Sequence, residues 1–477
     1  MLKPETKSVR EFYDALAEND GRWETGNRYF HDEDARYMRF LIPEGLKVLD
    51  LGCGNGDLLA ALCPKTGIGV DVSPKVVARA AAKHKGIDFR CGDIEDAAFI
   101  ADIARDGPFD VIVMSDAIGT LVDVQKTFDG LHALCSADTR IVIAYHSPLW
   151  RPVLGWAEKF GFKRPSPPQS WLSASDIGAI LGLSDFEEIK HEWRQIWPKR
   201  SFGLGPFLNR VIAPLPLIRT LCLRSYTVLR SKRQPAPAGL SCTVLVPCRN
   251  EKGNIEAAVT RTPRFCSDME ILFVEGHSSD GTLDEINRVI AAYPGVDIKV
   301  SVQPGKGKGD AVRHGFALAR GDVLMILDAD LTMPPEELPK YYAAITEGKA
   351  EFVNGSRLVY PMENDAMRFL NHIANATFAR IFSFLLNQRF TDTLCGTKVL
   401  RKRHYDKIVA GRGYFGDFDP FGDFDLIFGA AKLNLKVVEI PIRYQARTYG
   451  TTQISRFRHG WLLLRMVVFA YRKLKAF

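Results

Sequence analysis

Several features that define other classes of protein are missing from this sequence. No run of about eighteen or more apolar residues occurs, so no membrane-crossing helix is expected. The nine cysteines form no C-x-x-C pair and no regular framework, which indicates reduced thiols. No internal repeat and no low-complexity tract is found, which excludes a solenoid. No nucleic-acid-binding module can be read either, so we expect no nucleic-acid partner.

What is present indicates a folded chain with two domains. Its 477 residues exceed the size at which one hydrophobic core keeps growing, and 46% of them are apolar. The net charge is +7, and basic residues concentrate in 190–233 and 443–475. This charge favours an anionic partner such as a nucleotide, a lipid phosphate or an anionic membrane surface. The opening residues 1–20 are too charged for a secretory signal, so we expect a cytoplasmic protein.

From Lys47 onward, short apolar runs alternate with helical stretches. KVLDLG, GIGVDV, DVIVMSD and RIVIAYH read as strands, and 74–84 reads as a helix. This βαβ rhythm predicts a parallel α/β sheet. Two further β-rich segments, 187–197 and 221–229, complete the predicted sheet. We therefore expect a first domain over 1–232.

The same rhythm restarts after a proline-rich segment, 233–239, which we predict to be a linker. The new strands read CTVLVP, EILFVEG, IKVSVQP, VLMILDAD and EFVNGS. They predict a second α/β domain over 240–454, followed by a basic amphipathic helix over 455–477.

A glycine-rich loop marks a candidate site in the first domain. In VLDLGCGNGDL, Gly52, Gly54 and Gly56 stand between a strand and a helix, where missing Cβ atoms let a ligand approach the backbone. Polar residues then end the following strands, and parallel strands present these ends at one edge of the sheet. These residues are Asp71, Asp93, Ser115 and Asp116.

This pattern resembles the class I S-adenosylmethionine-dependent methyltransferases over about residues 40 to 230. The resemblance implies a Rossmann-like fold with Asp50, Gly52 and Gly54 at the methionine part of the cofactor, Asp71 at the ribose and Asp93 at the adenine. Gly56 and Ser115 are assigned to the same site. A nicotinamide dehydrogenase has a similar loop, but VLDLGCGNG followed by GVDVS and GDI fits methyltransferase spacing better. An ordinary strand-to-helix turn is the other alternative.

The methyl acceptor cannot be read from the sequence. Methyl transfer needs alignment and, for some acceptors, removal of a proton. His146, just past a strand end, is our candidate base, and a purely structural histidine is an equal alternative.

A second set of polar residues follows the strands of the second domain. Two aspartates in DAD lie on one face of an extended segment, where hard oxygen ligands suit Mg²⁺ or Mn²⁺. Short polar side chains at the first two strand ends can read a base and a ribose, and the lysines of PGKGKGD can face a diphosphate. The candidates for the nucleotide sugar are Pro247, Asn250, Glu251, Glu275, Asp280, Lys306, Lys308 and Asp328, and those for the metal are Asp328 and Asp330.

These segments resemble the family 2 glycosyltransferases of GT-A fold over about 240–449, and among them the polyprenyl-phosphate sugar transferases of the dolichol-phosphate mannose synthase type. The resemblance implies an inverting transfer from a nucleotide sugar. Asp280 and Asp328 would hold the nucleoside and Asp330 the metal. Catalytic or acceptor-side carboxylates would be Asp423 and Asp425, and the acceptor phosphate would meet Asp392, Lys398, Arg447 and Thr452.

Three departures from the family pattern leave the donor and the lipid-phosphate contact open. Glu275 and Gly276 replace paired aspartates, Thr332 replaces a glutamine, and Gln453 replaces a lysine. The alternative reading of DAD is a loop with solvated acids.

Two segments have a membrane-facing character. Residues 367–386 place Leu370, Ile373, Ala374, Thr377, Phe378, Ile381 and Phe382 on one helical face. The tail joins apolar residues to flanking arginines and lysines. Both segments could lie at the inner membrane face and present a lipid acceptor to the site. The tail could instead form a homo-oligomer contact. The alternative for both is that each helix simply packs on its own sheet.

Together these features predict a bifunctional enzyme that transfers a methyl group and a sugar. Soluble acceptors, or one domain acting as a non-catalytic scaffold, are the alternatives.

Overall fold

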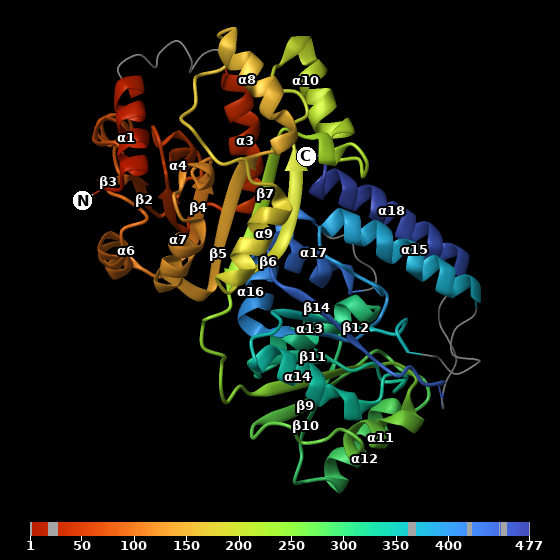
Figure 1. Ribbon diagram of the computed structural model, residues 1–477. Helices are drawn as coiled ribbons and strands as arrows, with labels where there is room; N and C mark the ends of the chain where they lie inside the picture. Colours follow the sequence, from red (N-terminus) through yellow and green to blue (C-terminus); the bar gives the residue numbers. More distant parts are fainter. Residues whose placement is uncertain are drawn as a thin grey trace. The chain divides into compact units, whose positions relative to one another are not determined.

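The structure is a computed structural model that describes residues 2–17, 27–360, 369–416, 422–447, 449 and 456–476. For 369–373 and 456–459 only the backbone is described. The chain forms two compact units, residues 1–235 and 236–475, each built around a seven-stranded sheet (Figure 1). Each unit is treated by itself below.

The sheet of the first unit has the strand order β3-β2-β1-β4-β5-β7-β6. The first five strands are parallel, and β7 runs antiparallel to both β5 and β6. The two late β-rich segments do complete this sheet, so the predicted α/β fold is confirmed. The strands are β1 (Lys47–Leu51), β2 (Thr66–Asp71), β3 (Asp88–Cys91), β4 (Phe109–Ser115), β5 (Cys135–His146), β6 (Phe186–Arg194) and β7 (Arg224–Ser231).

Helices cover both faces of this sheet, and side-chain caps fix where several begin. Ser73 accepts a hydrogen bond from the Val76 amide with Pro74 at the first helical position, so the predicted helix starts where expected and ends at Lys83. The helices are α1 (Pro4–Ala17), α3 (Arg28–Leu41), α4 (Asp57–Ala61), α5 (Pro74–Lys83), α6 (Ala97–Ile103), α7 (Val124–Leu131), α8 (Arg151–Lys159), α9 (Ala174–Leu183) and α10 (Leu204–Phe207).

The sheet of the second unit has the order β10-β9-β8-β11-β13-β12-β14. Only β13 runs antiparallel to its neighbours, and this mixed sheet confirms the second α/β domain. The sequence did not reveal β13 or β14, because β13 has only four residues and both lack a long apolar run. The strands are β8 (Cys242–Cys248), β9 (Met269–Glu275), β10 (Asp297–Val302), β11 (Val323–Ile326), β12 (Phe352–Ser356), β13 (Lys398–Arg401) and β14 (Val437–Pro441).

Two long helices of the second unit, α15 and α18, pack side by side (Figure 1). The apolar face predicted for α15 is wrong in part: Phe382 is buried, but Ala374 and Thr377 are exposed. The buried side is set by α17, where Phe382 packs against Phe424 and Phe428. The helices are α11 (Ile255–Thr260), α12 (Thr282–Ala292), α13 (Lys308–Leu318), α14 (Leu338–Thr346), α15 (Phe369–Leu386), α16 (Lys402–Gly411), α17 (Phe424–Lys432) and α18 (Arg456–Leu474). Among the residues that the structure describes, no helix has the length and apolar character needed to cross a bilayer.

Candidate functional sites

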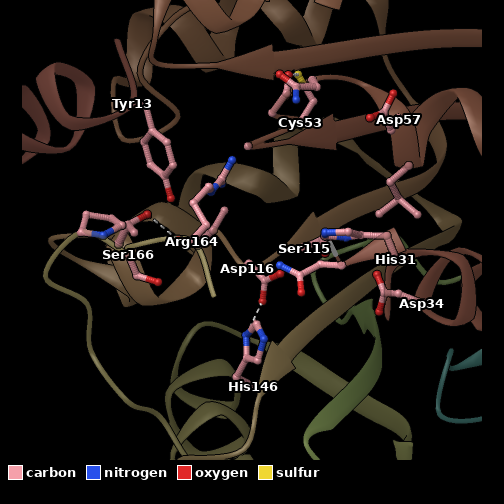
Figure 2. Close-up of a pocket in the computed structure, with 18 of the residues that line it drawn as sticks. Tyr13, His31, Asp34, Cys53, Asp57, Ser115, Asp116, His146, Arg164 and Ser166 are labelled. Atoms are coloured by element: carbon pink, nitrogen blue, oxygen red, sulfur yellow. Dashed lines mark hydrogen bonds and ion pairs between the residues drawn. The ribbon is translucent and has the colours of Figure 1, made fainter. Parts of the chain in front are cut away.

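A large cavity opens at the carboxyl ends of the central strands of the first unit (Figure 2). Its volume is about 950 Å³. It is lined by the glycine loop after β1, by the ends of β2, β4 and β5, and by side chains of α1, α3 and α8. Of the predicted cofactor residues, the structure brings six to this cavity: Asp50, Gly52, Gly54, Asp71, Asp93 and Ser115.

The glycine loop has a backbone that only glycine adopts easily. Gly52 has a φ of +81°, and a Cβ there would lie 2.6 Å from the Cβ of Ala117. Gly54 also has a positive φ, and nothing lies within 4 Å of its missing Cβ. The Gly54 amide donates to Asp71 Oδ2 at 3.1 Å, which ties the loop to the end of β2. Gly56 begins α4 and packs against Phe89, so its role is to shape the turn.

Asp50 is a buried acid with an unused oxygen. Its side chain is 1% exposed, and Oδ1 has no hydrogen-bond partner among the described residues. Burial, and then the charge of Asp71, raise its pKa to about 7. Burial also raises the pKa of Asp71, against the backbone amides of Ser73 and Gly54 that stabilise its ionised form. A positive group on a ligand would complete this arrangement.

A buried charge network lies beside the cavity (Figure 2). Arg224, on β7, pairs with Asp34 of α3 at 2.9 Å and with Asp116 after β4, and it donates to Ser115 Oγ at 2.9 Å. Asp116 also contacts His146 Nδ1 at 2.9 Å. The sequence did not identify Asp34 or Arg224 as site residues. The signal available in the sequence was an arginine inside the predicted β-rich segment 221–229, and the structure shows that all eight residues of this strand are buried.

This network holds the ring of His146 in place. Burial disfavours an ionised Asp116, but Arg224 and His146 outweigh it and hold the pKa of this carboxyl well below its usual value. An ionised Asp116 accepts a hydrogen bond from His146 Nδ1, which leaves the lone pair on Nε2. The imidazole stacks on Phe30, with ring centroids 5.8 Å apart. The result is an oriented histidine at the end of β5, on the cavity wall.

In the second unit, the first aspartate of DAD lies among lysines. Asp328 Oδ1 is 2.6 Å from Lys308 Nζ, and Lys308 Nζ is 3.9 Å from Asp423 Oδ1. Burial opposes the charge of Lys308, but Asp328 and Asp423 outweigh it and raise its pKa. A Cβ on Gly396 would collide with Asp328 and Lys308, so the segment 391–396 packs directly on this pair. Lys398 is fully buried and lies 3.9 Å from Asp423.

The second aspartate of DAD is held by an arginine. Arg447 Nη2 lies 2.5 Å from Asp330 Oδ2, and Arg447 Nη1 lies 3.3 Å from Glu251 Oε1. Thr332 donates to Asp330 Oδ1 at 2.8 Å. Burial raises the pKa of Glu251, although Asn254 and Arg447 favour its ionised form. The segment after β14 therefore closes on the ends of β8 and β11.

Several of the remaining predicted residues accept hydrogen bonds from the loops that follow β8 and β9, and the others lie elsewhere. Asp280 accepts from the Thr282 amide at 3.0 Å and from Tyr449 Oη at 3.3 Å, and Asn250 Oδ1 accepts from the Ser279 amide at 2.8 Å. Glu275 accepts from the amides of His277 and Ser278.

Asp392 forms a two-point pair with Arg357, at 2.6 and 2.9 Å. Asp425 lies apart, 2.8 Å from Arg412. Lys306 is exposed, Pro247 is half-buried at the end of β8, and Thr452 lies outside the described residues.

Comparison with known families assigns a class to each unit. Residues 26–191 match the family described as a methyltransferase domain, and residues 243–409 match glycosyl transferase family 2. The chain therefore joins a methyltransferase domain to a family 2 glycosyltransferase domain.

Curated relatives match the second unit. The chain is 34% identical over 109 residues to the dolichol-phosphate mannosyltransferase of Saccharomyces cerevisiae, covering 22% of this chain and 40% of the relative. It is 28% identical over 221 residues to that of Pyrococcus furiosus, covering 45% and 60%. It is 26% identical over 223 residues to the undecaprenyl-phosphate 4-deoxy-4-formamido-L-arabinose transferase of an Enterobacter species, covering 45% and 63%. The chain thus spans less than two thirds of each relative's length.

Solved structures similar to each unit include an S-adenosylmethionine-dependent methyltransferase from Thermotoga maritima, at 15% identity and a TM-score of 0.37, covering 47% of this chain and 100% of that one. They also include glucosyl-3-phosphoglycerate synthase from Mycobacterium tuberculosis, solved with Mn²⁺ and UDP. This second likeness has 16% identity and a TM-score of 0.36, and covers 50% of this chain and 81% of that one.

Replacing Arg224 by Met should destabilise the first unit strongly. The buried carboxylate of Asp34 would lose its cationic partner, which costs about 3–5 kcal/mol. Arg233→Met is the matched control, since that side chain is 43% exposed and ion pairs at the surface add little to stability. Urea unfolding followed by tryptophan fluorescence tests this, because six of the seven tryptophans precede residue 200. Equal midpoints for the two variants would contradict the expected role of Arg224.

Proposed function

We propose that the first unit transfers a methyl group from S-adenosylmethionine to a hydroxyl acceptor, and that the second transfers a sugar from a nucleotide sugar. The observation that carries the methyltransferase proposal is the unpaired oxygen of buried Asp50 beside a glycine loop. The cofactor carries an ammonium group, whose charge and donors match this oxygen. Asp71, at the next strand end, would take the ribose, and Asp93 the adenine edge.

S-adenosylmethionine, when bound, supplies an activated methyl group on a sulfonium. The work left to the protein is to align the acceptor and remove its proton. His146 is suited to the second task, because Asp116 keeps the Nε2 lone pair available and stabilises the imidazolium once a proton is taken. A hydroxyl acceptor needs such a base, so this pair favours O-methylation.

Cofactor binding should depend on the ionisation of Asp50. Its pKa of about 7 in the free protein means that binding of the ligand ammonium below pH 7 must displace a proton. The Kd for S-adenosylhomocysteine should therefore be constant above about pH 8 and rise toward tenfold per pH unit below pH 7. Calorimetric titration from pH 6 to 8.5 measures this. Asp50→Asn should bind S-adenosylhomocysteine more weakly, and its Kd should not change with pH in this way. A wild-type Kd that does not change with pH would show that Asp50 does not contact the cofactor.

The role of His146 predicts a selective loss of rate. His146→Gln should leave S-adenosylhomocysteine binding within about twofold and lower methyl transfer by about 10² to 10⁴-fold. The assay follows label from methyl-tritiated cofactor into a glycolipid extract from the source cells. His132→Gln is the control, since His132 bonds to Ser231 and to the Ser184 carbonyl and does not line the cavity. An unchanged rate in His146→Gln would leave this histidine a structural role only.

The glycosyltransferase proposal rests on the carboxylates around DAD. Asp328 and Asp330 offer hard oxygen ligands for Mg²⁺ or Mn²⁺, and each is paired with a cationic side chain, Lys308 or Arg447. A divalent cation would neutralise the diphosphate that leaves, and Lys308 would add a second positive charge there. Asn250, Glu251, Glu275 and Asp280 border the same strand ends and would hold the nucleoside.

The names of two relatives, a dolichol-phosphate and an undecaprenyl-phosphate transferase, support a polyprenyl-phosphate acceptor. An inverting transfer remains part of our proposal. A phosphate acceptor is already anionic and needs no base, whereas a hydroxyl acceptor would need one. Asp423 is the candidate base, because its Oδ1 makes no hydrogen bond among the described residues. Asp425 is less suited, since Arg412 holds it. Arg447, with Lys398, Asp392 and Thr452, remains our proposal for the acceptor side.

The outer face of α18 supports a site at the inner membrane surface. It exposes Trp461, Leu464 and Val468, and Arg465 and Arg472 are exposed between and beside them. Apolar side chains flanked by basic ones are typical of interfacial helices. The same face would also serve a homo-oligomer contact.

Nucleotide release from a panel of UDP-, GDP- and dTDP-sugars tests the second activity. With Mn²⁺, release by the wild type should rise on addition of polyprenyl phosphate. Asp330→Ala should lower release by at least about 100-fold, because it removes a metal ligand. Asp406→Ala, an exposed acid on α16, should retain the wild-type rate. Equal nucleotide release by Asp330→Ala and Asp406→Ala would contradict the metal-dependent mechanism.

A further inference from the structure

The outer side of α8 is apolar although the helix lines the cavity of the first unit. Val153, Leu154 and Ala157 contribute to the cavity wall. Trp156 and Phe160 point outward, are 71% and 61% exposed, and contact each other with ring centroids 5.8 Å apart. Leu149 before the helix and Phe162 after it are also exposed. The helix that forms part of the cavity wall therefore presents aromatic side chains to the outside.

A second apolar segment of the same unit adjoins α8. Residues 201–221 contain α10 and expose a further set of large apolar side chains: Phe202, Leu204, Phe207, Val211, Leu215, Leu217 and Leu221. The two segments are joined where Trp150 Nε1 donates to the Leu221 carbonyl at 2.8 Å. Pro198 and Lys199, just before this segment, line the cavity together with α8. Figure 1 shows α8 and α10 at the same end of the unit.

Basic residues outnumber acids along the two segments of this surface, which we call the α8–α10 surface, although Glu33 of the neighbouring α3 pairs with Arg210 at 3.3 Å. Residues 149–165 hold four basic residues and one acid, Glu158, which pairs with Lys163 at 2.6 Å. Residues 198–221 hold four basic residues and no acid. The eight basic residues are Arg151, Lys159, Lys163, Arg164, Lys199, Arg200, Arg210 and Arg219.

Apolar area of this extent on a folded domain indicates a docking surface. Aromatic residues with a basic surround match the interfacial zone of an anionic bilayer, where aromatic rings enter the headgroup layer and cations meet lipid phosphates. A second copy of the chain would instead place its own basic residues against these, which like-charge repulsion disfavours.

We propose that the α8–α10 surface docks on an anionic membrane, and that the methyl acceptor is a membrane-held molecule whose hydroxyl-bearing head enters the cavity beside α8. This inference rests on the proposed methyltransferase function and names its acceptor class. It is separate from the α18 face, which belongs to the other unit. Docking there brings the cavity of His146 to the depth of lipid headgroups.

Flotation of the full chain with vesicles tests the proposal. The vesicles contain about one third phosphatidylglycerol, and neutral phosphatidylcholine vesicles are the comparison. All proteins carry Trp461→Glu, so that α18 contributes little. Adding Trp156→Glu and Phe160→Glu should lower the partition coefficient at least about tenfold, because two inserted rings become charged. Adding Leu183→Glu, which alters an equally exposed side chain at the end of α9, should leave it unchanged.

Three measurements keep the outcomes distinct. S-adenosylhomocysteine binding should be the same in the parent and in all variants, and a parent that does not bind it would count against the methyltransferase function instead. Vesicle binding should weaken with rising salt and on neutral lipid. The proposal is overturned if Trp156→Glu/Phe160→Glu floats like its parent, or if the parent does not bind anionic vesicles. It is also overturned if light scattering shows that these substitutions convert a dimer to a monomer, since the surface is then a contact between copies.

Discussion

Acidic side chains at the ends of central strands are the constraint around which both units are built. A carboxylate in such a place loses water, and the protein must supply a positive partner or leave the group ready for one. Asp34 and Asp116 share Arg224, Asp328 takes Lys308, and Asp330 takes Arg447. Among the described residues Asp50 has no such partner, and burial together with the charge of Asp71 raises its pKa.

The difference between the unpaired Asp50 and the paired Asp328 and Asp330 favours a different kind of ligand in each unit. A site whose acid is unpaired favours a cation, as the first unit does at Asp50. A site whose acids are each already balanced by a lysine or arginine can exchange that partner for a metal ion, while the freed base turns to an anionic phosphate. In the proposed function, Lys308 and Arg447 would balance the charges of Asp328 and Asp330 while no metal is bound. They would contact the diphosphate once the metal has taken their place.

The sequence revealed the parts of these sites that lie close together along the chain. The glycine loop, the strand-end aspartates and DAD are local patterns tied to a strand, so they could be placed on a sheet edge before the fold was known. The pair of Arg224 and Asp34 could not be found this way, because 190 residues separate them and only the order of strands brings them together. The same holds for Arg357 with Asp392, which depends on β12 lying beside β13.

Helix faces were harder to assign than strand ends for a related reason. The periodicity of α15 allows more than one apolar side, and which side is buried depends on the aromatic residues of α17 and on the neighbouring α18. The apolar segment around α10 is a different case, since many of its large side chains stay exposed.

An exposed apolar surface costs stability in water unless something covers it. The α8–α10 surface and the outer face of α18 are two such surfaces among the described residues, and they belong to different units. Both are bordered by basic residues, so one anionic lipid surface satisfies both without any fixed arrangement of the units. Restricting two active sites to the same plane would raise the encounter rate with lipid-held substrates, in the way that a linker raises effective concentration. The two proposals together favour a sugar carried on a lipid phosphate as the methyl acceptor, because its hydroxyls could take the methyl group and its lipid anchor would lie in that plane.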